Sequence, residues 1–331
     1  MKLHWRAIGL LTIATTMLVP MAGAAVASPS PVAASCFKVT ATIRVAPGPD
    51  GVAVNLATNT IYVTNGNQNT VSVINGQTNK ITATFPGGGS PDLAAVNPRT
   101  DTVYVTNLPG GTVSVVDGQT NKITATVTVG HDPDGIAVAP VTNRIYVVDG
   151  DANTVSVISG RTKKVIATVP VGNSPQGVAV NPATTTIYAV NLFGRDVSVV
   201  DGHTNKVTAT IKLGGEPLRA AADPKTDTIY VTNAVGTVQV IDGQANKITA
   251  TVSVGKTPVG VAVDQNIGKV FVANANSDSV SLINVGTNKA SATIGVGSQP
   301  LVVAVNPRTH AAYVANNSSG TLSVLTRHCP I

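Results

Sequence analysis

One five-residue pattern repeats along the chain at a nearly constant spacing. It first appears as IYVTN at residues 61–65 and returns as VYVTN at residues 103–107. Successive copies are 42, 42, 42, 42, 41 and 42 residues apart. The aromatic residue of the pattern occurs at Tyr62, Tyr104, Tyr146, Tyr188, Tyr230, Phe271 and Tyr313. A fixed period of this length predicts a repeat architecture of seven similar units, each of which needs its neighbours to bury its apolar faces.

Each repeat contains four short runs in which apolar and polar residues alternate. In the second copy they lie at residues 93–98, 102–107, 112–118 and 122–129, and we name these runs strands a, b, c and d. Val, Ile, Thr and Tyr at a period of two favour half-buried strands, and turn sequences separate them. After the N-terminal segment, no run shows helical periodicity. The pattern predicts an all-β, seven-bladed β-propeller with four antiparallel strands per blade.

The two ends of the chain indicate how the ring closes. A run of the strand d type, KVTATIRV at residues 38–45, precedes the first strand a. The last repeat supplies strands a, b and c and then stops. We expect residues 38–45 to complete the seventh blade, because an open ring would leave unpaired strand edges.

Two cysteines lie beside this junction. Counting from the flanking strands places Cys36 and Cys329 at the same position of the turn between strands c and d. In an exported protein a disulfide can persist, so we predict a Cys36–Cys329 bond that locks the closure. The alternative is a lipid attached to Cys36, which follows the sequence AAS.

The first residues have the features of a secretory signal peptide. Lys2 and Arg6 precede an apolar run, and AVA at residues 25–27 offers a cleavage site, with a second one after Ala34. We therefore expect a signal peptide at residues 1–27, a short linker at 28–35 and one propeller domain at 36–331. This predicts a secreted, periplasmic or cell-surface protein, with no membrane span in the mature chain.

Composition limits the classes of partner. Hydrophobic residues make up 43% of the chain and charged residues only 11%, which is typical of a globular protein with a large core. Removing the signal peptide lowers the formal net charge from +6 to +4, and lysine and arginine do not cluster. This argues against nucleic-acid binding, and we expect a soluble monomer.

The verbatim repeats resemble a known family. YVTN occurs at residues 62–65, 104–107 and 230–233, and DGQTNKITATV at residues 117–127. These motifs are similar to those of the YVTN-repeat family of β-propellers. The resemblance implies a cell-surface, periplasmic or secreted propeller, often a binding or scaffold domain without assigned chemistry. Related propellers include lactonases and streptogramin-opening lyases. Val148, Asp149 and Ala189 depart from the motif, and the sixth and seventh copies match it less well.

The candidate site comes from comparing one position across the repeats. In propellers, the d–a and b–c loops share the face around the central channel. The residue after the proline of the d–a loop is, in order, Asp50, Asp92, Asp134, Gln176, Leu218, Val259 and Leu301. Three neighbouring blades would therefore present carboxylates at the channel mouth. Arg219 and Glu216 lie in the fifth blade, across from them.

The third blade adds polar groups to this face. They are His131 and Asp132 in its d–a loop and Asp149 and Asp151 in its b–c loop. Such a cluster could hold Ca²⁺ or Mg²⁺, with Asp50, Asp92 and Asp134 as ligands, or place an acid and a base near a substrate. The alternative is that Pro-Asp-Gly merely forms turns in which Asp caps the backbone.

No established catalytic motif is present, and the other histidines do not converge. The loop NLFGRD at residues 191–196 could anchor a partner through Phe193 and Arg195, or it could pack on its own blade. Two function classes remain. The first is a binding or scaffold module for a protein, glycan or cell-wall partner. The second is a metal-assisted hydrolase or lyase of the lactonase or streptogramin type, whose catalytic residues the sequence does not identify.

Overall fold

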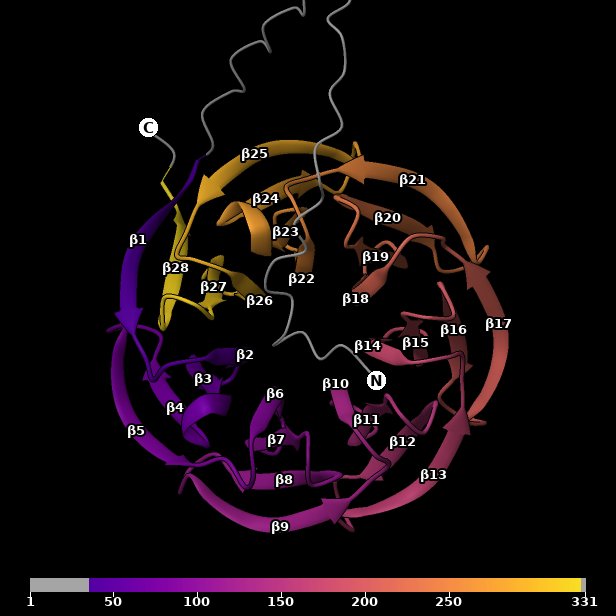
Figure 1. The fold of residues 1–331 in the computed structure, drawn as a ribbon, viewed down its shortest axis with the longest axis horizontal. Coiled ribbons are helices and arrows are strands. Elements are labelled where there is room, and N and C mark those ends of the chain that lie inside the picture. Colours follow the sequence, from indigo (N-terminus) through magenta and orange to yellow (C-terminus); the bar gives the residue numbers. More distant parts are fainter. Residues whose placement is uncertain (1–35, 329–331) are drawn as a thin grey trace, which may run out of the picture. The chain divides into compact units, whose positions relative to one another are not determined.

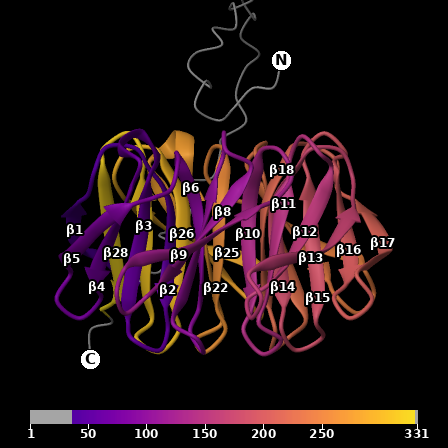
Figure 2. The ribbon, with the colours of Figure 1, turned by 90° about the horizontal axis from the view of Figure 1, so that it is seen from below.

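The chain forms a ring of seven four-stranded sheets around one axis (Figure 1). The computed structural model describes residues 36–328. Neighbouring strands within the sheets are antiparallel. Seen from its edge, the ring shows the sheets standing side by side (Figure 2). The predicted seven-bladed propeller is confirmed.

The first three blades follow the order a, b, c, d from the axis outward. Blade 1 comprises β2 (Pro49–Asn55), β3 (Thr60–Asn65), β4 (Thr70–Asn75) and β5 (Lys80–Pro86). Blade 2 comprises β6 (Pro91–Asn97), β7 (Thr102–Asn107), β8 (Thr112–Asp117) and β9 (Lys122–Thr128). Blade 3 comprises β10 (Pro133–Ala139), β11 (Arg144–Asp149), β12 (Thr154–Ser159) and β13 (Lys164–Pro170).

The remaining blades repeat this order. Blade 4 comprises β14 (Pro175–Asn181), β15 (Thr186–Asn191), β16 (Asp196–Asp201) and β17 (Lys206–Lys212). Blade 5 comprises β18 (Pro217–Asp223), β19 (Thr228–Asn233), β20 (Thr237–Asp242) and β21 (Lys247–Ser253). Blade 6 comprises β22 (Pro258–Asp264), β23 (Lys269–Asn274), β24 (Ser279–Asn284) and β25 (Lys289–Gly295). Blade 7 comprises β26 (Pro300–Asn306), β27 (Ala311–Asn316), β28 (Thr321–Arg327) and β1 (Phe37–Arg44).

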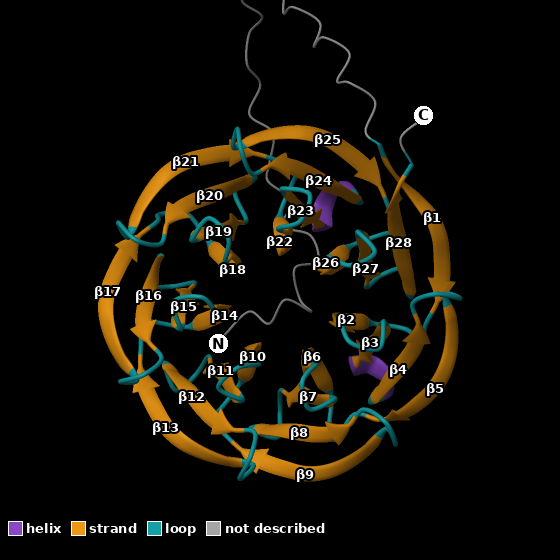
Figure 3. Cartoon of the chain, turned by 180° about the vertical axis from the view of Figure 1, so that it is seen from behind, coloured by secondary structure: helices purple, strands orange, loops and turns teal. Residues whose placement is uncertain are grey.

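Helix is confined to two short 3₁₀ turns in the described residues, η2 (Gly66–Gln68) and η3 (Ala275–Ser277). They lie in the b–c loops of blades 1 and 6 and stand out from the strands in Figure 3. No helix within residues 36–328 has the length and apolar character that crossing a bilayer requires.

The N-terminal strand closes the ring as the sequence predicts. β1 pairs antiparallel with β28, from Phe37 opposite Arg327 to Arg44 opposite Thr321. A bulge between Val39 and Ala41 shifts the register. As a result Phe37 packs in the core shared with blade 6, where it meets Phe271 edge-on at 5.2 Å between ring centroids. β1 therefore bridges two cores and removes an open edge.

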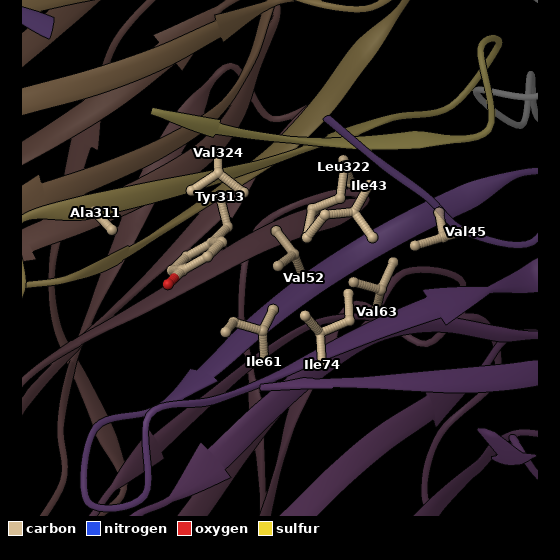
Figure 4. Packing of buried hydrophobic residues seen from close by; sticks show 11 residues of the cluster. Ile43, Val45, Val52, Ile61, Val63, Ile74, Ala311, Tyr313, Leu322 and Val324 are labelled. Atoms are coloured by element: carbon tan, nitrogen blue, oxygen red, sulfur yellow. The ribbon is translucent and has the colours of Figure 1, made fainter. Parts of the chain in front are cut away.

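The seam between blades 7 and 1 is packed like the other interfaces. Tyr313 and Val324 of blade 7 lie against Ile61 of blade 1, while Ile43 of β1 joins the same cluster (Figure 4). Each of these side chains is at most 9% exposed. Because one sheet cannot cover both of its faces, this interdigitation between blades is the main source of stability.

The repeated tyrosine accounts for the five-residue pattern. Tyr62, on strand b of blade 1, packs among Val103, Val105 and Val116 of blade 2. Burial, with Coulombic repulsion from Asp101 and another carboxylate, raises the pKa of Tyr62 to about 12, so its hydroxyl is neutral at physiological pH. Each blade thus inserts one aromatic side chain into the next, which is why the motif recurs at the repeat period.

The outer strands carry features that protect their free edges. All seven contain a lysine at or next to their start, for example Lys80 in β5 and Lys122 in β9. The Thr82 hydroxyl donates to the Val73 carbonyl oxygen at 3.3 Å, beside a break in register between β4 and β5. Edge lysines and bulges both disfavour pairing with another chain.

The predicted signal peptide at residues 1–27, the linker at 28–35 and Cys329 lie outside the described residues. The His328 amide donates to the Cys36 carbonyl oxygen, so the two ends of the described chain are adjacent. The Cys36–Cys329 disulfide, its lipid alternative and the cleavage site stay predictions.

Candidate functional site

The candidate site lies at one end of the seven innermost strands. In blade 1, Pro49 at the start of β2 pairs with Asn65 at the end of β3. The d–a and b–c loops therefore share one end of every blade, and we call this end the loop face. We call the other end, which carries the a–b and c–d turns, the turn face. A break in strand register follows the proline of each inner strand, as between Pro49 and Gly51. Such a bulge changes the direction in which the following side chains point.

Four blades have glycine at the third position of the inner strand. A Cβ on Gly177 would lie 2.5 Å from the carbonyl oxygen of Leu218, and one on Gly135 would lie 2.7 Å from that of Gln176. These glycines are therefore spacers between neighbouring inner strands. Pro-Asp-Gly at residues 133–135 belongs to β10 rather than to a turn.

Arg219 occupies the equivalent position in blade 5 and reaches across the site. Its Nη2 donates to Asp134 Oδ1 at 2.7 Å, and its Nη1 donates to the carbonyl oxygen of Gln176. The side chain therefore extends from blade 5 past blade 4 to blade 3. Gly177 makes this course possible, because a Cβ there would lie 2.8 Å from the Arg219 Cα.

The ion pair is largely removed from solvent. The Arg219 side chain is 18% exposed and that of Asp134 is 9% exposed. Burial alone would lower the pKa of Arg219, but Asp134 and Asp92 raise it by more, so the guanidinium stays charged. The Nε of Arg219 is buried and has no hydrogen-bond partner among residues 36–328.

Asp92 is the neighbouring group with the most altered ionisation. Burial, followed by repulsion from Asp134, raises its pKa well above the ordinary value of 3.8, although Arg219 opposes this. Asp50 raises it further, and a hydrogen bond joins the Asp92 and Asp134 side chains. Because two adjacent carboxyls resist ionising together, Asp134 favours the protonated form of Asp92.

Asp50 completes the cluster from the first blade. Asn317 Nδ2 of the blade 7 b–c loop donates to Asp50 Oδ1 at 2.8 Å. The structure thus gathers Asp50, Asp92, Asp134 and Arg219 at one end of the inner strands, as the repeat comparison predicts. We call these four residues the axial cluster. Gln176 contributes its carbonyl oxygen to the contact with Arg219.

The other two predicted site residues are placed differently. Asp149 is fully buried and accepts hydrogen bonds from Gly130 N at 3.0 Å, Thr154 Oγ1 at 2.9 Å and Ser156 Oγ at 2.7 Å. It takes the place of the Asn that ends strand b in the other blades and joins strand b to strand c, so its contacts are structural. His131 lies exposed in the d–a loop before Pro133.

The metal hypothesis finds little support in the arrangement of side chains. Within the described part of the chain, no group of three or more His, Cys, Asp or Glu residues is gathered closely enough to hold a metal ion. One of the three carboxylates proposed as ligands, Asp134, is engaged by Arg219. The axial cluster is better suited to hydrogen bonding, since it combines guanidinium donors with carboxyl oxygens that can accept.

The comparisons with known proteins support the fold. No family model matches the chain, and the comparison with curated proteins gives no match. Among solved structures, the chain is similar to hydrazine synthase from Kuenenia stuttgartiensis, with a TM-score of 0.76 and 20% sequence identity. The match covers 84% of this chain and 95% of that one. At this identity, the likeness shows the propeller fold alone.

Sequence reasoning missed two parts of the site. Asn317, the partner of Asp50, lies in a polar loop, NNSSG, that gives no hint of its contact. The spacer role of Gly177 was also missed. The sequence signal for this role lies at the third position of the inner strand, where some blades have glycine and others have Leu93, Arg219 or Val302. A large residue among glycines indicates where the inner strands leave room.

Proposed function

We propose that this chain is a secreted propeller of the YVTN-repeat type that acts as a binding or scaffold module. Its ligand or partner, a protein, glycan or cell-wall component, binds on the loop face, at the axial cluster. The rigid ring positions loops of different sequence at one end, which is the usual arrangement for binding sites.

The observation that carries the proposal is the buried guanidinium of Arg219. Four blades show that the fold is satisfied by glycine at this position, so the ring itself does not need an ion pair here. The Arg219 Nε is buried and has no partner among the described residues, and a buried donor is costly unless something accepts its hydrogen. A ligand with hydroxyl, amide or carboxylate oxygens would meet this requirement.

The test is a thermal-shift screen of the purified protein against soluble glycans, cell-wall fragments and peptides, with Ca²⁺, Mg²⁺ and EDTA included. We expect an oxygen-rich ligand to raise the melting temperature of the wild type and of Arg144→Met, but not of Arg219→Met. Arg144 is the matched control, because it donates to the Gly202 carbonyl oxygen on the turn face. A ligand that stabilises Arg219→Met as much as the wild type would overturn the proposal.

The second candidate is a metal-assisted hydrolase or lyase resembling the lactonase or streptogramin-lyase propellers. The raised pKa of Asp92 favours acid–base chemistry at the axial cluster, since a carboxyl whose pKa is raised is better able to act as a general acid. Turnover of lactone or streptogramin substrates that is lost in Asp92→Asn would support this candidate. If no substrate were turned over while ligand binding was intact, the second candidate would be rejected and the binding module would remain.

A further inference from the structure

The two faces of the ring carry opposite net charge. Within residues 36–328, every lysine, arginine, aspartate and glutamate lies in a loop or near one end of a strand, so each belongs to one face. The turn face carries fifteen lysines and arginines against seven aspartates, a formal net charge of +8. The loop face carries five against nine acidic residues, a net charge of −4. The net charge of +4 for the described residues is therefore the sum of a basic face and an acidic face.

The repeat itself gathers much of the positive charge. Each outer strand has a lysine at or next to its start, and all seven lysines are exposed. None of them forms an ion pair with an acidic residue of the described chain. They lie 41 or 42 residues apart in the sequence, which therefore shows no run of basic residues. The outer strands form the circumference of the ring (Figure 1), so the fold places these lysines around one rim.

Protection of the outer edges accounts for those seven lysines but not for the other basic residues of the turn face. Exposed cations occupy the second position of the a–b turn in three blades, namely Arg99, Lys225 and Arg308. Blades 1 and 4 have Ala57 and Ala183 at this position, so the turn does not need a charge there.

The c–d turn of blade 3 adds three consecutive basic positions with one threonine among them. Arg161 and Lys163 precede Lys164, whereas blades 1 and 2 have Gln and Asn at the first two of these positions. Lys163 has a φ of 54°, a region that suits Asn better, and its Nζ donates to Thr124 Oγ1 of blade 2 at 3.0 Å. The turn begins with Ser159, where blades 2, 4 and 5 have aspartate. Turn geometry therefore gives no reason for this gain of positive charge.

The aspartates of the turn face do not offset this charge at the surface. Each of the seven is buried or half-buried. Asp117 accepts hydrogen bonds from the backbone of its own turn, from Gln119 N at 3.0 Å and Thr120 N at 2.8 Å. Asp264 is fully buried, and its Oδ2 lies 2.9 Å from His310 Nδ1. The carboxylates are thus engaged within the ring, whereas the strand-start lysines reach solvent.

Exposed apolar side chains accompany the cations. Eight large hydrophobic side chains of the described chain are exposed, and six of them lie towards the turn face. These six are Val141 in an a–b turn and, within the first three residues of outer strands, Ile81, Ile123, Ile166, Val207 and Ile248. Val141 is the most exposed of the eight, at 71%. Cations with shallow apolar side chains match a bilayer surface, where apolar acyl chains lie beneath charged headgroups, whereas a soluble polyanion offers no apolar layer.

We propose that the turn face docks on a lipid bilayer that contains anionic headgroups. Its lysines and arginines pair with the headgroups, and Val141 reaches the boundary between headgroups and acyl chains. The turns of the blades end at a common level (Figure 2), as contact with a plane requires. The loop face then points away from the membrane. The inference goes beyond the proposed function and does not depend on it, because the axial cluster lies at the opposite end of the blades.

The test measures sedimentation of the purified protein with vesicles of phosphatidylcholine, alone or with about one third phosphatidylglycerol. We expect binding only to the anionic vesicles, weakening as salt is added. Arg161→Gln with Lys163→Asn, which introduces the residues of blades 1 and 2, should weaken binding at least about tenfold. Arg44→Thr with Lys256→Ser is the matched control, since it removes the same charge from the loop face, and it should bind like the wild type.

A third variant separates a membrane from a soluble polyanion. Val141→Ala introduces the residue of blades 1 and 4 and leaves the charge unchanged. It should weaken vesicle binding about threefold, because less apolar surface enters the bilayer, and leave binding of long-chain polyphosphate unchanged. Melting temperatures close to that of the wild type would show that each variant is folded.

Three results would overturn the inference. They are no binding to anionic vesicles, equal binding to neutral vesicles, and equal losses in the turn-face and loop-face pairs. Binding of polyphosphate without binding of vesicles would also overturn it, since the turn face would then serve a soluble polyanion.

Discussion

The two faces of the ring differ in how often the same contact between neighbouring blades recurs. On the turn face the same contact links four pairs of neighbouring blades. In each pair, the side-chain amide of an Asn at the end of strand a donates to a residue in the a–b turn of the following blade. These contacts are Asn55 to Asp101, Asn97 to Asn143, Asn181 to Asp227 and Asn306 to Asn59. On the loop face, Arg219 with Asp134 and Asn317 with Asp50 each occur once.

This difference teaches where fold and function reside. Contacts that recur in several interfaces help to join the blades. Contacts found once are not required by the ring, because other blades at the same position do without them. The loop face is therefore the region in which side chains were free to form a site, and the turn face is the region that a ligand-binding experiment should leave unchanged.

The largest expected effect concerns the shared core. Tyr188→Ala should lower the free energy of unfolding by about 3–5 kcal/mol, because it leaves a cavity between blades 4 and 5. Tyr188→Phe is the control and should change little, since Phe271 fills the equivalent place in blade 6. Chemical denaturation measures both. A small effect of the alanine variant would show that the repeated aromatic residue does not hold the blades together.

The axial cluster should give the next largest effect. Arg219→Met should destabilise the protein by about 2–4 kcal/mol at pH 7, because it leaves the buried Asp134 carboxylate without its partner. Arg144→Met, which loses a bond to a neutral carbonyl on the turn face, should cost about 1 kcal/mol. If the two variants lost equal amounts of unfolding free energy, the two faces would not differ in this respect.

A pH titration sharpens the role of Asp92. Its folded-state pKa is raised by burial and by Asp134, so its contribution to stability is complete below the unfolded-state pKa of about 4 and is lost as pH rises through the folded-state pKa. Asp92→Asn keeps a donor to Asp134 without this titration. The variant should therefore gain stability relative to wild type above that window and show no gain below about pH 4. Parallel pH profiles of the two proteins would contradict a raised pKa for Asp92.

The turn face should give the smallest effect. Asn181→Ala removes one amide contact between blades 4 and 5 and should cost about 1 kcal/mol. Blade 3 already has Ala139 at this position, so the ring tolerates its absence. Ligand binding should be unaffected, as titration of the variant would show. A loss of binding would mean that the two faces are coupled.

The fold could be predicted from the sequence because every repeat imposes the same local pattern. The tyrosine period predicted the number of blades, and the spare strand at residues 38–45 predicted the closure, since both follow from counting. The grouping of Asp50, Asp92 and Asp134 followed in the same way, because equivalent positions lie at the same end of each blade.

The contacts within the site depend on distances in space, which the spacing of repeats along the sequence does not give. The reach of Arg219 to Asp134 requires the room above Gly177, which is known only once the inner strands are placed. The sequence pattern placed Asp149 in the site, although its structural contact with Ser156 repeats the contact of Asn65 with Ser72. Comparing that seven-residue spacing across the blades would have revealed its role.

A crystallographic fragment screen of the propeller tests most directly whether the loop face is the binding surface. Because the fragments are small and chemically diverse, they sample both faces equally. We predict that bound fragments gather on the loop face at Arg219 and Asp134. Fragments spread evenly around the ring, or gathered on the turn face, would contradict the account.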